Sequence, residues 1–206
     1  MMRWAVASTI AFAWLGASAQ AQPHQATHYS YYGISGNSPG SIYTTMISRG
    51  PKVGGVKAYA KTLAISTPVI KMVQGNTCQI RQFDINFTFD INLPKLKNEA
   101  ALTGRTKSEW KAFSGFLKVH EETHRRIWME FANIFEARAR GLKARTCSEM
   151  AAKIVKVRTQ LAVVCNRRQE AFDNAQQQVL LRQPFVKLVL AQGTHSSTAL
   201  KSRRKG

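Results

Sequence analysis

His120-Glu121-Glu122-Thr123-His124 places two histidines four residues apart, with a glutamate directly after the first. Residues four apart on an α-helix share one face, so two neutral imidazoles at this spacing can bind one metal ion. A zinc ion lowers the pKa of water toward about 7, and a neighbouring glutamate can accept the proton of that water. The pattern therefore predicts a Zn²⁺ hydrolase site, with His120 and His124 as metal ligands and Glu121 as the general base.

A catalytic zinc ion needs a third protein ligand, which we expect on the helix after the motif. In an antiparallel hairpin that turns near residues 141–146, positions level with each other sum to about 287. The centre of the motif then lies level with about residue 165, within one or two helical turns. The candidates in this range are Cys165, Glu170 and Asp173. A carboxylate gives two histidines plus an acid, and a thiolate gives two histidines plus a cysteine.

The motif lies within a long predicted helix. Thr106-Lys107-Ser108-Glu109 is typical of a capping box that begins a helix, and Gly141 ends it. Apolar residues recur between them at helical spacing: Trp110, Phe113, Leu117, Ile127, Trp128, Phe131, Ile134 and Phe135. The two motif histidines lie on or beside this apolar stripe, so we expect the motif to face the interior. Gly115 in the same helix is expected to allow close packing against a neighbour.

The clearest strand runs from Phe83 to Leu93, where apolar and polar residues alternate without a break. This alternation predicts a strand with one buried face, which ends at Pro94. Other elements are predicted from caps and apolar runs: strands over 28–34, within 56–66 and over 69–73, and helices over 39–49 and from Cys147 to near Leu181. The fold class is therefore α+β, a small antiparallel sheet followed by a long antiparallel helical hairpin that carries HExxH.

The first 21 residues have the organisation of an export signal. Arg3 precedes an apolar stretch over residues 4–16, and two possible cleavage sites of the small-residue type follow, Ala17-Ser18-Ala19 and Ala19-Gln20-Ala21. We expect three segments: a signal peptide (1–21), a single domain (22–192) and a basic disordered tail (193–206). The mature protein would then be periplasmic or secreted.

Basic residues strongly outnumber acidic ones, with 30 Lys and Arg against 11 Asp and Glu and a formal net charge of +19. This balance favours anionic partners. The basic residues are spread along the predicted helices and the tail without a recognisable nucleic-acid-binding module, so we expect no nucleic acid partner. For an exported protein, anionic lipid headgroups or acidic polymers of the cell envelope fit this charge better.

Three cysteines in an oxidising compartment predict one disulfide bond and one free thiol. Cys147 begins the helix that also carries Cys165, and about 18 residues of helix span about 27 Å. A disulfide requires Cα atoms within about 7 Å, which excludes that pair. Cys78 must therefore pair with one of the two, and we favour Cys147.

Several segments resemble one bacterial family in their order and spacing. These segments are Tyr31-Tyr32-Gly33-Ile34-Ser35-Gly36, Arg49-Gly50-Pro51, the Cys78 strand that ends in Pro94, Trp110, the HEETH helix, Cys147 and Phe172-Asp173. The family is a domain family of unknown function described as predicted secreted zinc-dependent proteases. The resemblance implies an exported, metallopeptidase-like domain, and it supplies no substrate because the family has none established. The predicted zinc chemistry itself leads us to expect a peptide or protein substrate. In such a peptidase we expect the sheet region over 83–93 to border the substrate cleft, as an edge strand does in related metallopeptidases.

The chain departs from the family pattern at one place. In the family, the acid that matches Asp173 precedes a threonine and then a His-Gly pair, whereas this chain continues with Asn174-Ala175-Gln176. The histidine is therefore missing. If it is the family's third ligand, catalysis in this chain requires a different side chain in its place. The family match favours Asp173, with Glu170 or Cys165 as the alternatives.

Two classes of function follow from the sequence. The first is an exported zinc-dependent peptidase with Glu121 as the general base. The alternative is a non-enzymatic or catalytically dead envelope protein, in which the HExxH helix is vestigial and the basic surface binds anionic partners.

Overall fold

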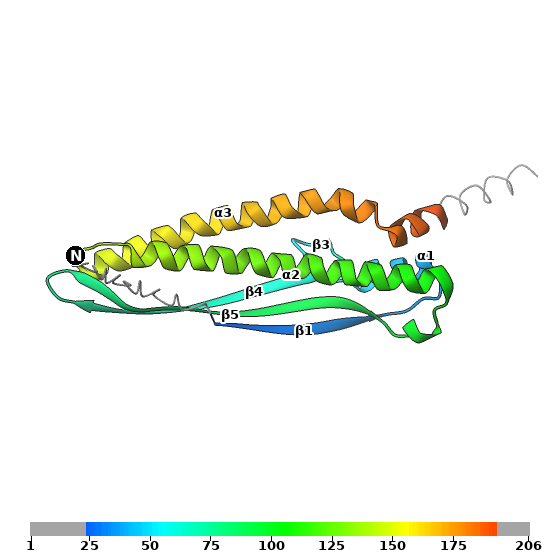
Figure 1. The fold of residues 1–206 in the computed structure, drawn as a ribbon, viewed down its shortest axis with the longest axis horizontal. Coiled ribbons are helices and arrows are strands. Elements are labelled where there is room, and N and C mark those ends of the chain that lie inside the picture. Colours follow the sequence, from blue (N-terminus) through cyan, green and yellow to red (C-terminus); the bar gives the residue numbers. More distant parts are fainter. Residues whose placement is uncertain (1–23, 193–206) are drawn as a thin grey trace, which may run out of the picture.

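The computed structural model describes residues 24–192, in which two long helices lie along a three-stranded sheet (Figure 1). The α+β fold class is confirmed. The predicted signal peptide (1–21) and the predicted tail (193–206) lie outside the described residues. Within residues 24–192, no helix combines the length and the apolar character that a membrane span requires.

The sheet has the strand order β1-β5-β4, with β1 over Gln25–Ile34, β4 over Lys61–Gln74 and β5 over Cys78–Leu96. Strands β4 and β5 pair antiparallel, as predicted. Strand β1 instead pairs parallel with β5, so the expectation of a wholly antiparallel sheet is wrong. The chain between them includes α1 (Pro39–Arg49), β2 (Lys52–Val53), β3 (Val56–Lys57) and β4. A connection of this length lets the two strands run in the same direction.

Strand β5 continues past its predicted end and includes Pro94. Its pairing with β4 ends at Asn92, so at Pro94 it has only β1 as a neighbour and the missing N–H costs no bond to β4. The two short strands predicted over 56–66 and 69–73 form one strand, β4. Strand β5 is the middle strand, so residues 83–93 have no free edge, and none of them lines the cavities at the HExxH motif. The edge strand beside the helices is β4.

The long helices are α2 (Gly104–Arg140) and α3 (Cys147–Leu181). Thr146 caps α3 by accepting a hydrogen bond from the Glu149 backbone N–H, and the helix begins at Cys147 as predicted. Helix α2 begins earlier than predicted, because Thr103 rather than Thr106 takes the extended N-cap conformation. The predicted disulfide is confirmed: Cys78 and Cys147 are joined, with an S–S distance of 2.05 Å, and this bond ties β5 to the start of α3.

Two glycines differ in what surrounds them. Gly115 is exposed on α2, and a Cβ atom there would meet nothing within 4 Å, so the expected close packing is wrong. At Gly50, a Cβ atom would lie 2.2 Å from the backbone oxygen of Ala58. Glycine at this position therefore allows α1 to end against the segment that leads into β4, and that segment borders the candidate site.

Candidate metal centre

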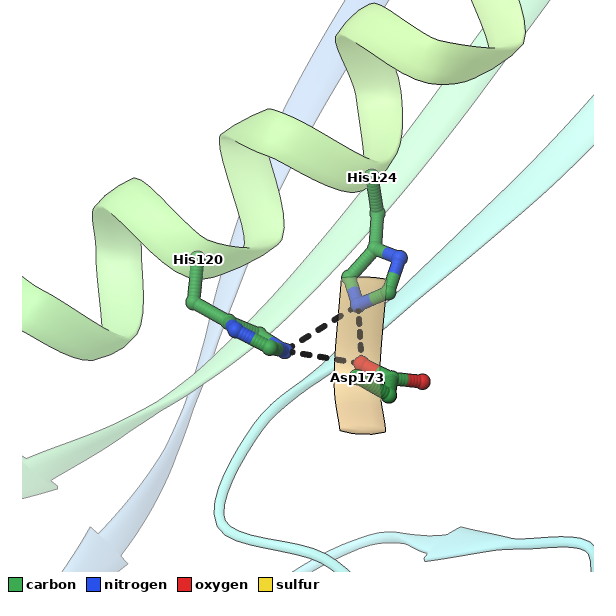
Figure 2. Close-up of side chains that lie close together, drawn as sticks. All are labelled: His120, His124 and Asp173. Carbon is green, nitrogen blue, oxygen red and sulfur yellow. Dashed lines mark hydrogen bonds and ion pairs between the residues drawn. The ribbon is translucent and has the colours of Figure 1, made fainter. Parts of the chain in front are cut away.

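Three side chains from the two long helices converge on one point (Figure 2). The Nε2 atoms of His120 and His124 lie 3.2 and 2.9 Å from Oδ1 of Asp173. The two Nε2 atoms are 3.1 Å apart. The helical spacing of the motif brings the imidazoles together on α2, and Asp173 projects from the facing turn of α3.

The other two candidates for the third ligand lie elsewhere. Glu170 borders the adjoining cleft but is not part of the three-residue cluster. Cys165 is a free, buried thiol nearer the start of α3, and burial raises its pKa to about 11. A thiol with this pKa remains protonated near neutral pH and is a poor metal ligand. Of the three candidates, the structure brings only Asp173 to both imidazoles.

The offset between the helices explains why Asp173 rather than Cys165 lies opposite the motif. The hairpin estimate placed residue 165 level with residue 122 of the motif, whereas in the structure Asp173 lies there. The difference corresponds to about 12 Å along α3. The start of α3 is held at the far end of the sheet, where Cys147 is bonded to Cys78 and Met150 packs in the same apolar cluster. The disulfide-linked end of the sheet therefore sets which residue of α3 meets the motif.

Gln169 holds His124 at two points. Its Nε2 donates to the backbone oxygen of His124 at 3.1 Å, which turns its Oε1 toward Nδ1 of the same histidine at 2.5 Å. This amide orientation assigns the ring proton to Nδ1, so Nε2 presents a lone pair toward Oδ1 of Asp173. Two electron-rich atoms at 2.9 Å need a cation between them, either a proton or a metal ion.

The ionisation of the cluster agrees with this arrangement. Burial lowers the pKa of His124, but hydrogen bonds with Asp173 and Gln169 outweigh burial and raise this pKa above its usual value. Burial raises the pKa of Asp173, but hydrogen bonds with the two histidines lower it by more, so the pKa lies well below its usual value. The cluster therefore holds an ionised carboxylate that strongly favours a bound cation.

Phe172 fixes the planes of the two imidazoles. Its ring stacks on His120 with a centroid separation of 4.8 Å and an interplanar angle of 29°. It also meets His124 edge to face, with a centroid separation of 5.1 Å. The residue before the aspartate thus restricts ring rotation on the side of α3.

Glu121 is the one charged side chain among the described residues that is classed as buried, with 5% of its surface exposed. The hydroxyl of Thr62 on β4 donates to this glutamate, with Oγ1 2.7 Å from the carboxylate Oε2 and 3.1 Å from the backbone oxygen. Burial raises the pKa of Glu121, and the hydrogen bond from Thr62 and the electrostatic influence of the two histidines offset part of that rise. A carboxyl group with a raised pKa is suited to accept a proton near neutral pH.

Two cavities meet at the cluster, with volumes of about 300 and about 440 Å³. Both are lined by His120, Glu121 and Asp173, and both are bounded by α2, by α3 and by the segment from Ala58 to Ala60. The candidate ligand atoms and the buried carboxylate therefore face one open cleft between the 58–62 segment and the two helices.

The donor atoms fit a zinc ion. Zinc bound at about 2.0–2.1 Å in tetrahedral geometry separates its ligand atoms by about 3.3 Å. The three distances here, 2.9, 3.1 and 3.2 Å, approach that value. Two histidines and one acid form the ligand set of a catalytic zinc site with an open position, and Gln169 supplies the outer hydrogen bond that such histidines require.

Sequence reasoning missed Gln169 and Thr62. Gln169 could have been found, because it lies four residues before Asp173 and therefore on the same face of α3. Thr62 carried no such signal, because its contact with Glu121 depends on how β4 packs against α2. Both residues act on the motif through hydrogen bonds from other elements.

The fold and the site define an α+β protein with a two-histidine, one-aspartate cluster beside a buried glutamate. The sequence model of the family "Bacterial protein of unknown function (DUF922)" matches residues 29–179, and the chain belongs to this family. The match supports the resemblance to a bacterial family of unknown function. No curated protein and no solved structure matches the chain.

Proposed function

We propose that this chain is an exported zinc-dependent peptidase, in which His120, His124 and Asp173 bind Zn²⁺ and Glu121 is the general base. One observation carries the proposal: three ligand atoms converge within 3.2 Å of one another beside a buried carboxylate in an open cleft. When bound, zinc would supply a Lewis acid that polarises a carbonyl and lowers the pKa of water.

The chain's own residues supply the proton transfers. Glu121 keeps Oε2 in its hydrogen bond with Thr62, which leaves Oε1 to accept a proton from the attacking water. The same carboxyl group can then deliver that proton to the leaving amine, as peptide hydrolysis requires. Thr62 holds the carboxylate in one rotamer, and Phe172 covers the imidazoles on one side.

Export is part of the proposal. The disulfide bond between Cys78 and Cys147 is typical of proteins outside the reducing cytoplasm, and residues 1–21 have the pattern of a signal peptide. We therefore place the peptidase in the periplasm or outside the cell, with peptides or unfolded proteins as substrates.

The test is metal content together with hydrolysis. Mature protein purified with zinc present is expected to hold about one zinc ion per chain, the stoichiometry of a single site. Changing both His120 and His124 to alanine should remove the zinc with the fold intact, as judged by circular dichroism. His28→Ala is the matched control, because His28 is an exposed residue of β1 and lies outside the three-residue metal-binding cluster. A wild-type protein without zinc after this purification would refute the proposal.

Glu121→Gln separates catalysis from binding. In a peptidase it should retain zinc and reduce hydrolysis of an unfolded protein substrate by about 10²- to 10⁴-fold, the usual contribution of a general base. Retained zinc without any wild-type hydrolysis would instead indicate a catalytically dead metal-binding protein.

The net charge of +19 favours one alternative function, an envelope protein that binds anionic surfaces without catalysis. In that case the protein should bind vesicles of anionic lipid, with an affinity that falls as salt increases, and Glu121→Gln should leave this binding unchanged. Vesicle binding that persists while hydrolysis is absent would favour the alternative.

A further inference from the structure

A separate apolar cavity of about 240 Å³ lies farther along the same face of the protein. Its walls come from β4, β5 and both long helices: Ala64, Ser66, Pro68, Ile85, Phe87, Trp128, Phe131, Ala132, Phe135, Arg158, Leu161, Ala162 and Cys165. Trp128 also lines the cleft at the metal-binding cluster. The apolar cavity and the candidate site are therefore neighbours that share one wall.

Small side chains on β4 create this cavity. Residues paired across neighbouring strands project to the same face, and Ala64, Ser66 and Pro68 pair with core residues of β5. The three β4 residues therefore project toward the helices, where they meet aromatic side chains of α2. Because alanine, serine and proline are short, the space between β4 and the helices remains open.

The free edge of β4 runs beside both cavities. Pro68 has no N–H and lies where the register with β5 is regular, from Lys61 to Lys71, so its nitrogen must point away from β5. By the two-residue period of a strand, the backbone N–H and C=O groups of Thr62, Ala64 and Ser66 point to the same free edge. An extended polypeptide can add to an edge of this kind by main-chain hydrogen bonds.

Counting residues along three elements gives similar distances between the candidate metal cluster and the centre of the apolar cavity. The cavity lies about 14 Å along α2 from the level of the motif and about 17 Å along α3 from Asp173, at 1.5 Å per residue. Along β4 it lies about 13 Å from Thr62, at 3.3 Å per residue. An extended chain covers this distance in about four or five residues.

We propose that the apolar cavity is a substrate subsite, which binds one bulky apolar side chain of an extended polypeptide four or five residues away from the cleaved bond. The proposal rests on the proposed peptidase function. The volume of about 240 Å³ is below the range of about 300–1,000 Å³ for sites of drug-sized molecules, and it suits a single large side chain. Continuity with the metal cleft through Trp128 identifies the occupant as part of the same polypeptide.

The subsite is tested first by cleavage. Zinc-loaded mature protein is incubated with a library of peptides, and the cleaved bonds are identified by mass spectrometry. We expect Phe, Trp, Leu and Met to be enriched about tenfold or more at four or five positions from the bond, on one side. Ala162→Phe fills the cavity from its exposed rim and should abolish this enrichment. Ala152→Phe, an exposed position of the same helix outside the cavity, should leave it unchanged.

Binding provides a readout that does not depend on hydrolysis. Labelled 12-residue peptides of Gly, Ser and Thr, with or without one Phe, are titrated against zinc-loaded Glu121→Gln protein by fluorescence anisotropy. The peptide with Phe should bind about 10- to 100-fold more tightly, from burial of the aromatic ring. Ala162→Phe should remove this difference. Ser66→Phe fills the cavity from the opposite wall and replaces Ala162→Phe if that variant does not fold.

The outcomes distinguish the subsite from the peptidase proposal. Cleavage without the positional enrichment overturns the subsite and leaves the peptidase proposal standing. If no peptide is cleaved, but the Phe peptide binds more tightly and Ala162→Phe removes this difference, the cavity binds an apolar side chain of a polypeptide. That result overturns the peptidase proposal and, with it, the role of the cavity in cleavage. Equal or undetectable binding of both peptides without enrichment overturns the subsite.

Discussion

Replacing Gln169 by methionine should weaken zinc binding at a site where Gln169 itself is not a ligand. The substitution keeps the length of the side chain but removes the acceptor for Nδ1 of His124 and the donor to the His124 backbone. A largely buried polar group left without a partner costs about 1–3 kcal/mol. At 1.4 kcal/mol for each factor of ten, this cost predicts about a 5- to 150-fold weaker affinity. Loss of an outer hydrogen bond to a metal-bound histidine has effects in the same range.

The assay is a competition titration of zinc between the protein and a chromophoric chelator of known affinity. Gln160→Met is the matched control, because Gln160 is exposed on the same helix and lines none of the described cavities near the site. Gln169→Glu keeps an acceptor for the imidazole and loses the backbone donor, so its affinity should lie between those of the wild type and Gln169→Met. Asp173→Asn should weaken binding more than any of these changes, because it removes the charge of a ligand.

Wild-type affinity in Gln169→Met would refute the assignment of Gln169 as the residue that orients His124. An equal loss in Gln160→Met would attribute the effect to a general weakening of α3. An affinity of Gln169→Glu below that of Gln169→Met would show that the Nδ1 acceptor is not the important contact.

Three further predictions concern stability and reactivity. Replacing Cys78 and Cys147 by serine opens a 69-residue loop and should lower the free energy of unfolding by about 4 kcal/mol, as measured by urea denaturation. Gly115→Ala should raise that free energy by about 0.5–1 kcal/mol, because it stiffens an exposed helical position without a clash, whereas Gly50→Ala should lower it by about 1–3 kcal/mol. The Cys165 pKa of about 11 leaves about 0.1% thiolate at pH 8, so alkylation should be slow and should accelerate as pH rises.

Each of these predictions has a control. Reduced wild-type protein should unfold like the double serine variant, and a difference between them would point to an effect of the serines themselves. A stabilised Gly50→Ala protein would contradict the close approach of that residue to the Ala58 carbonyl. Alkylation of Cys165 at the rate of the unfolded chain would show that the thiol is open to solvent in the native protein.

Local patterns predicted much of the fold because they report geometry within one element. Apolar spacing placed the body of α2, the start at Cys147 placed α3, and the alternation from Phe83 to Leu93 placed the buried face of β5. The parallel pairing of β1 and the edge position of β4 were not predictable in this way. Both depend on how strands far apart in the chain are ordered in the sheet.

The sequence alone determined the half of the site that one helix carries. A 3.6-residue repeat brings His120 and His124 to one face with Glu121 beside them, whatever the rest of the protein does. The sequence left three candidates for the third ligand, because the offset between two helices depends on what holds their ends. The tertiary structure decided which of the three faces the motif. The disulfide-linked end of the sheet holds the start of α3, and the resulting offset between the two helices brings Asp173 to the imidazoles. The packing of β4 in turn supplies Thr62 to the buried Glu121.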